Sequence, residues 1–207
     1  MIGATSLRRH VAAWWRRSLL LVVPLLTVCF YLGRADSAEV SLGDDPNIRI
    51  SYYEIEGNTI EELRQALLTR GPIDEKGVRR FAYTRWFISW RWPHLDGAAV
   101  LSRATAAYKI DIFVPQWNEP RGASTEVRMR WSSFIAALLA HEKNHVEFAR
   151  HNFAHIAELI QQAATSNPKL SEDQAEQIAQ RELSRIRMLD WSYDTDTNHG
   201  KLEGVVL

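Results

Sequence analysis

A long stretch of helical periodicity constrains the fold of this 207-residue chain more than any other feature. Apolar side chains recur at helical spacing from about residue 124 to about residue 165, which predicts one helix of roughly 60 Å. Asn167-Pro168 then ends the helix. A second helix is predicted from Ser171, which forms a capping box with Gln174, to about Trp191. With so short a connection, we expect the two helices to form an antiparallel hairpin.

Three earlier segments carry the signals of β-strands. Residues 82–92 and 104–114 follow a period of two, and residues 47–55 are rich in β-branched and aromatic side chains. Between them a short helix begins at Thr59, which we expect to form a capping box with Glu62. These elements predict an α+β fold, in which a small antiparallel sheet packs on the long helix and on the C-terminal antiparallel helix.

The first 38 residues have the composition of an export signal. A basic stretch covers residues 8–17, residues 18–32 carry no charge, and small residues follow up to Ala38. Fifteen uncharged residues are short for a membrane span, which takes about 20. We therefore expect residues 1–38 to be a signal peptide, or else an N-terminal anchor, and the protein to be periplasmic or secreted. Membrane contact is expected only through residues 18–32, if the signal is not cleaved.

The charge of the remaining chain argues against a nucleic-acid partner. Lys plus Arg equals Asp plus Glu at 25 each, but the first 38 residues hold five arginines and one aspartate, so 20 basic and 24 acidic groups remain. Such a chain has no basic surplus to neutralise a phosphate backbone. We interpret residues 39–47 as a linker and residues 48–207 as a single domain, without disulfides because the one cysteine is Cys29.

The long helical stretch carries His141-Glu142-Lys143-Asn144-His145, the HExxH arrangement of zinc sites. Residues four apart lie about 40° apart around a helix and about 6 Å apart along it, so both imidazoles can bind one Zn²⁺. Glu142 is rotated by about 100° from His141, where it can act as a catalytic base toward a metal-bound water. The alternative is that both histidines are hydrogen-bonded core residues, although burying two imidazoles without a shared partner is costly.

A zinc site of this kind needs a third protein ligand. His151 stands ten residues after His141, but Phe148 occupies the position where a glycine would have to break the helix. We therefore reject His151 as a ligand, and His155 lies still farther along the helix. Both are expected on a solvated or partly buried polar face.

The helical hairpin offers better candidates, because it brings residues 191–194 level with residues 142–146. The returning segment contains Tyr193, Asp194 and His199. As the metal ligand we favour His199 over Asp194, since Asp194 could equally orient a ligand imidazole. Tyr193 is a candidate catalytic residue that donates a hydrogen bond to the oxyanion.

These residues resemble a bacterial family of unknown function that is described as predicted secreted zinc-dependent proteases. The similarity covers nearly all of residues 48–205. It is carried by Gly57, Leu63, Gly71-Pro72, Thr84, Trp86, Trp90, Pro115, Trp117, Trp131, the HExxH sequence and the pattern YDxxTxHG that ends at Gly200. The resemblance implies a zincin-like metallopeptidase in which His141 and His145 bind the metal, Glu142 is the catalytic glutamate, and Asp194 and His199 belong to the C-terminal motif.

We therefore expect residues 48–207 to form a zinc metallopeptidase domain that hydrolyses a peptide or protein substrate. One alternative is a non-catalytic periplasmic zinc-binding protein with a structural metal site. Another is a partner-binding module whose contact face is formed by Trp86, Trp90 and Trp92. An amidase that acts on cell-wall peptides would use the same metal-site residues as a protease.

Overall fold

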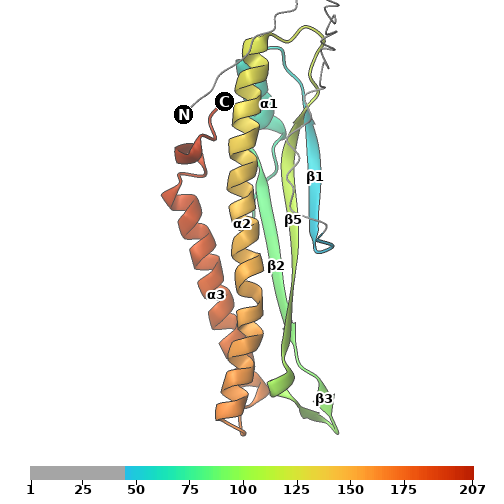
Figure 1. Cartoon of the computed structure of the whole chain (residues 1–207), viewed down its shortest axis with the longest axis vertical. Helices are drawn as coiled ribbons and strands as arrows, with labels where there is room; N and C mark the ends of the chain where they lie inside the picture. Colours follow the sequence, from blue (N-terminus) through green and yellow to red (C-terminus); the bar gives the residue numbers. More distant parts are fainter. Residues whose placement is uncertain (1–44) are drawn as a thin grey trace, which may run out of the picture. The chain divides into compact units, whose positions relative to one another are not determined.

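The computed structural model describes residues 45–207, so the predicted signal peptide and most of the predicted linker lie outside the described residues. Two long helices run side by side along one face of a small sheet (Figure 1). In chain order the elements are β1 (Ile48–Ile55), α1 (Ile60–Arg70), β2 (Tyr83–Arg91), β3 (His94–Leu95), β4 (Ala98–Ala99), the 3-10 turn η1 (Leu101–Arg103), β5 (Thr105–Trp117), α2 (Thr125–Ser166), α3 (Glu172–Asp196) and the 3-10 turn η2 (Lys201–Glu203). The predicted α+β class is confirmed.

The three-stranded sheet is mixed, and the prediction of an antiparallel sheet was wrong. Its order is β1-β5-β2, with β5 parallel to β1 and antiparallel to β2. The strand that comes last in the sequence therefore lies in the centre, where Ile110, Asp111 and Ile112 are all buried. A period of two indicates which side chains share a face of a strand, but it does not indicate which strands are neighbours.

The predicted helix starts are found at Thr59, Ser124 and Ser171, each of which accepts a hydrogen bond from a backbone N–H in the first turn. Ser171 forms the complete capping box with Gln174. The box predicted at Thr59 is only half formed, because the carboxylate of Glu62 accepts from the backbone N–H of Asn58 instead, at 2.6 Å.

The second long helix is longer than predicted. We expected α3 to end at about Trp191, but it continues to Asp196. The chain leaves the helical conformation only where Asn198, His199 and Gly200 adopt positive φ angles. Tyr193 and Asp194 therefore lie on the helix itself and not in a tail beyond it.

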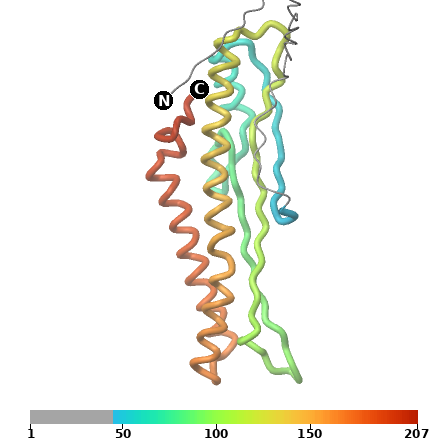
Figure 2. Tube along the Cα trace, in the orientation of Figure 1, coloured from blue at the N-terminus to red at the C-terminus, as the bar shows by residue number. Residues whose placement is uncertain are grey.

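Two hydrophobic clusters hold the layers together. The first joins the sheet and α1 to the N-terminal half of α2 and includes Leu63, Ile110 and Phe134. The second joins the C-terminal half of α2 to α3, with Ile160 and Ile186 fully buried. Figure 2 shows the two helices side by side over their shared length. Because the second cluster sets how α3 lies on α2, it also sets which residues of α3 reach the HExxH turn.

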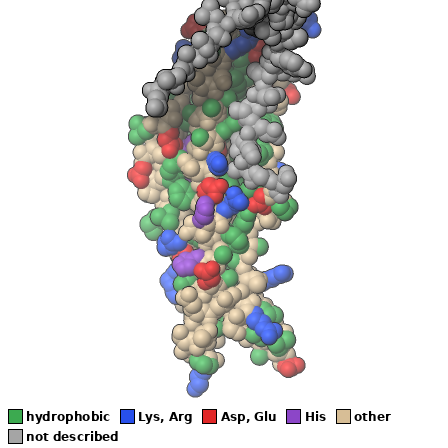
Figure 3. All heavy atoms as spheres, viewed as in Figure 1, with side chains coloured by type: hydrophobic (Ala, Val, Ile, Leu, Met, Phe, Trp, Pro, Cys, Tyr) green, Lys and Arg blue, Asp and Glu red, His purple; other side chains and the backbone are tan. Residues whose placement is uncertain are grey.

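Charged side chains of both signs are interspersed on the face drawn in Figure 3, without one large basic patch. This distribution agrees with the mildly acidic balance of residues 39–207. Within residues 45–207, none of the helices is both long enough and apolar enough to cross a membrane.

The helical hairpin can be tested by truncating one buried side chain. We expect Ile186→Ala to lower the free energy of unfolding by roughly 2–5 kcal/mol, because it leaves a cavity between α2 and α3. Met188, on the same helix, is 64% exposed, so Met188→Ala should change stability by less than about 0.5 kcal/mol. Urea unfolding followed by circular dichroism measures both. Equal effects of the two substitutions would contradict the packing described for α3.

Candidate metal centre

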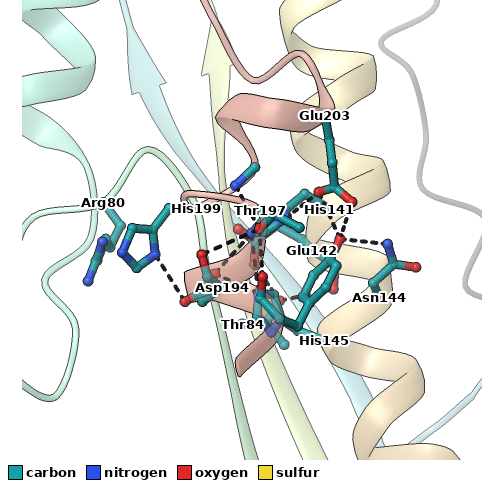
Figure 4. Close-up of polar contacts among 12 residues, drawn as sticks. Arg80, Thr84, His141, Glu142, Asn144, His145, Asp194, Thr197, His199 and Glu203 are labelled. Atoms are coloured by element: carbon teal, nitrogen blue, oxygen red, sulfur yellow. Dashed lines mark hydrogen bonds and ion pairs between the residues drawn. The ribbon is translucent and has the colours of Figure 1, made fainter. Parts of the chain in front are cut away.

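The hairpin brings Asp194 of α3 against the two histidines of α2 (Figure 4). One carboxylate oxygen of Asp194, Oδ1, lies 3.1 Å from Nε2 of His141 and 3.2 Å from Nε2 of His145. The two Nε2 atoms are 3.3 Å apart. In the described part of the chain, this is the one group of three or more His, Cys, Asp or Glu side chains close enough to hold a metal ion.

The spacing of these three atoms fits a zinc ion. Zinc binds imidazole nitrogen and carboxylate oxygen at about 2.0–2.1 Å in tetrahedral sites, which places neighbouring ligand atoms about 3.3–3.4 Å apart. The three separations here, 3.1, 3.2 and 3.3 Å, approach that value. The donor set of two imidazoles and one carboxylate is also one that catalytic zinc sites use.

His199 lies beside this group and is not part of it. Its Nδ1 is 3.2 Å from Oδ2 of Asp194, the oxygen that does not face the HExxH histidines. His199 is excluded from the group because of the length of α3. Asp194 still lies on the helix, on the face that packs on α2, whereas His199 follows the end of the helix. The structure thus brings Asp194, the less favoured of the two sequence candidates, to His141 and His145.

Two carboxylates that the sequence analysis missed hold the outer nitrogens of the histidines. Nδ1 of His145 is 2.7 Å from Oδ1 of Asp190, and Nδ1 of His141 is 2.8 Å from Oε2 of Glu203. Asp190 could have been found, because it precedes Asp194 by one helical turn and so shares its face. Glu203 had no such signal, since it lies in the irregular turn η2 beyond the helix.

The charges of this cluster favour a cation. Burial by itself lowers the pKa of His145, but hydrogen bonds with Asp190 and Asp194 outweigh burial and raise the pKa to about 10. The pKa of His141 is also raised, because Asp194 and Glu203 together outweigh its burial. Burial would raise the pKa of Asp194, yet the two histidines hold it well below its usual range. Positive charge between these side chains is therefore stabilised by the surrounding carboxylates.

Glu142 lies on the side of the HExxH turn that faces the sheet. Its side chain is buried, and its Oε2 accepts a hydrogen bond of 2.7 Å from the hydroxyl of Thr84 on β2. Burial is the largest effect on its pKa and raises it. Thr84 entered the sequence analysis only through the family resemblance, and the structure gives it a physical role, which is to orient this carboxylate.

The ring of Tyr193 stacks on the imidazole ring of His141, with ring centroids 5.0 Å apart. Its hydroxyl accepts from the side-chain amide of Asn144 at 2.7 Å and contacts the carboxylate of Glu203 at 2.8 and 2.9 Å. Burial raises the pKa of Tyr193 to about 12, and the hydrogen bond with Glu203 adds to this effect while the one from Asn144 opposes it. The hydroxyl thus already has partners, and its predicted role as an oxyanion donor stays a prediction.

A cleft of about 290 Å³ opens beside the cluster. His141, Glu142, His145, Asp194 and His199 all line it. Its further lining is apolar at Leu68, Phe81, Leu138 and Val205, and basic at Arg79, Arg80 and Lys201. The buried side chains of Glu142 and the two histidines therefore share one cleft.

The other two histidines of α2 are engaged elsewhere. Nδ1 of His151 lies 2.8 Å from the backbone oxygen of Glu147, and its side chain is 75% exposed. Nδ1 of His155 lies 2.9 Å from the carboxylate of Glu182 on α3. Both therefore lie on a partly solvated polar face, as expected.

Two tryptophans of β2, Trp86 and Trp90, and Trp92 just after this strand contact α3. Trp86, Trp90 and Trp92 are partly buried against the second hydrophobic cluster. Their indole N–H groups donate to the carboxylates of Asp190, Glu176 and Glu172, at 3.2, 2.8 and 2.6 Å respectively. The alternation of tryptophans along this strand is thus explained by contacts inside the fold.

Comparison with known proteins identifies a family but no characterised relative. Searches of curated proteins and of solved structures return no match. One family model matches residues 50–200, a span that includes nearly all of the sheet, both long helices and every residue of the three-atom cluster. That family is described as bacterial protein of unknown function. The chain therefore belongs to the bacterial family of unknown function DUF922.

Proposed function

We propose that this protein is a periplasmic or secreted zinc-dependent metallopeptidase with a zincin-like site. The observation that carries the proposal is the triangle formed by Nε2 of His141, Nε2 of His145 and Oδ1 of Asp194, which lies in a cleft beside the buried carboxylate of Glu142. In this proposal Asp194 is the third metal ligand, and His199 is held against its second oxygen.

A zinc ion bound by these three side chains would lower the pKa of a water molecule and polarise the carbonyl group of a peptide bond. In this proposal Glu142 accepts the proton of that water and passes it to the leaving amine. Its raised pKa suits this role, because a base that must also act as an acid works best with a pKa nearer to neutrality. Thr84 keeps the carboxylate oriented through its hydrogen bond.

The position of β2 at the edge of the sheet, within the described part of the chain, supports a peptide as the substrate. The sheet order leaves β2 at an edge, and its first residues, Tyr83 and Thr84, line the cleft. An extended peptide that pairs with this edge would gain main-chain hydrogen bonds and pass Glu142. The apolar lining at Leu68 and Leu138 would then receive one of its side chains.

Zinc content tests the ligand set. We expect one zinc ion per chain in the protein from Glu39 onward, measured by elemental mass spectrometry. His141→Ala and Asp194→Ala should lose the metal because each removes one of the three clustered atoms. His199→Ala should retain it, as should the control His151→Ala. Zinc lost in His199→Ala but kept in Asp194→Ala would reverse the assignment of the third ligand, and a zinc-free wild type would overturn the proposal.

Hydrolysis tests the role of Glu142. Glu142→Gln should keep its zinc and lose a factor of roughly 10²–10⁴ in the cleavage of a fluorescently labelled unstructured protein, because the proton acceptor is gone. Glu147→Gln is the control, since Glu147 lies on the same helix but pairs with Arg150 and His151. Unchanged cleavage in Glu142→Gln would refute the mechanism. A wild type that unfolds on chelation and cleaves nothing would instead favour a structural metal.

The burial of Glu142 should be measurable as a pH-dependent loss of stability in the metal-free protein. Its pKa in the native state lies above the unfolded value of 4.5, so the native state holds the proton more tightly. The free energy of unfolding should then fall as the pH rises from this value through the native pKa. Glu142→Gln lacks this loss, so its advantage over the wild type should be larger at pH 8 than at pH 4 in urea unfolding with a chelator. An advantage that shrinks with rising pH would contradict this.

A further inference from the structure

Glu203 lies outside the span that the family model matches, yet it contacts the candidate metal centre directly. Its Oε2 is 2.8 Å from Nδ1 of His141, whose other nitrogen faces Asp194. We propose that Glu203 is a positioning residue that fixes the ring of His141 for metal binding. This inference rests on the proposed function and adds to it a residue that the HExxH and YDxxTxHG patterns do not contain.

The chemistry follows from the two nitrogens of an imidazole. A neutral histidine carries its proton on one nitrogen and a lone pair on the other. When Nδ1–H donates to the carboxylate of Glu203, Nε2 is left with the lone pair that a metal requires, and it points toward Nε2 of His145 and Oδ1 of Asp194. Asp190 does the same for His145 from the other side. Each HExxH histidine therefore has its own carboxylate.

The backbone of the turn places Glu203 with little freedom. Gly200 has a φ of 77°, and a Cβ atom there would lie 2.6 Å from Val205 and 3.0 Å from His141, so the turn packs directly on the histidine ring. The N–H groups of Glu203 and Val205 both donate to the carbonyl of Gly200, at 2.9 and 3.0 Å. Val205 and Leu207 are buried in the first hydrophobic cluster and anchor the segment just after Gly204.

The side chain of Glu203 is held as well. The hydroxyl of Tyr193 lies 2.8 and 2.9 Å from its two carboxylate oxygens, and Asn144 donates to the same hydroxyl at 2.7 Å. Figure 4 shows Asn144, Glu203 and His141 around this contact. Asn144 is one of the two variable positions within HExxH, so the helix that carries His141 also supports, through Tyr193, the acid that orients it.

Zinc affinity and histidine NMR test the proposal together. We expect Glu203→Ala to weaken zinc binding about 10–100-fold in competition with a chelator, and Glu203→Gln to weaken it less, because an amide oxygen can still accept from Nδ1–H. Glu158→Gln is the control, since Glu158 is an exposed residue of α2 away from the centre. Urea unfolding of all variants checks that each one is folded.

The NMR measurement uses zinc-loaded protein labelled with ¹⁵N in histidine. In the wild type the Nδ1–H protons of His141 and His145 should both be protected from exchange. Glu203→Ala should lose the signal of His141 and keep that of His145, which Asp190 still holds. If Glu203→Ala lost both signals, or bound zinc as tightly as the wild type, the role of Glu203 would be overturned while the proposed function would stand. A wild type that binds no zinc would overturn the proposed function together with it.

Discussion

The packing of α3 on α2 is the interaction on which the candidate centre depends. This packing is maintained by the second hydrophobic cluster, in the C-terminal half of α2. There Ile156 and Ile160 are buried against Ile186, and the small side chains of Ala175 and Ala179 allow the helices to approach closely. A shift of α3 by a single residue would rotate each of its side chains by about 100°, which would turn Asp190 and Asp194 away from α2. The relative position of the three clustered atoms therefore depends on apolar side chains that are not in contact with them.

Strand β2 ties this hairpin to the sheet with side chains from one of its faces. Thr84 binds Glu142 of α2, and Trp86 binds Asp190 of α3, which in turn holds His145. Trp90 then binds Glu176 farther along α3. Because alternate residues of a strand share a face, Thr84, Trp86 and Trp90 all point at the helices. Contacts with this one strand therefore fix the positions of both helices. They also fix Glu142 directly and His145 through Asp190.

The sequence sufficed for those parts of the structure that depend on local spacing. The capping box at Ser171, the long helix and the placement of His141 and His145 on its buried seam all follow from residues within a few turns of one another. The order of the strands did not follow, because the partner of β1 is a strand some 60 residues later, which no local pattern identifies. The end of α3 did not follow either, because the helix continues to Asp196 after its apolar repeat has stopped near Trp191. Glu203 reaches His141 through a turn of positive φ angles, which periodicity does not describe.

The centre draws its residues from both the helical hairpin and the sheet, which bears on the order in which its parts can form. His141, His145, Asp190 and Asp194 all belong to one helical hairpin with a connection of five residues, from Asn167 to Ser171. The sheet is complete only when β1 pairs with β5, some 60 residues later, and contacts between segments far apart in sequence form slowly. The half of the centre that would hold a cation comes from the hairpin alone, and its contact between His141 and Asp194 spans 53 residues, fewer than the contacts between β1 and β5. The half that would orient Glu142 and receive a substrate must wait for the sheet.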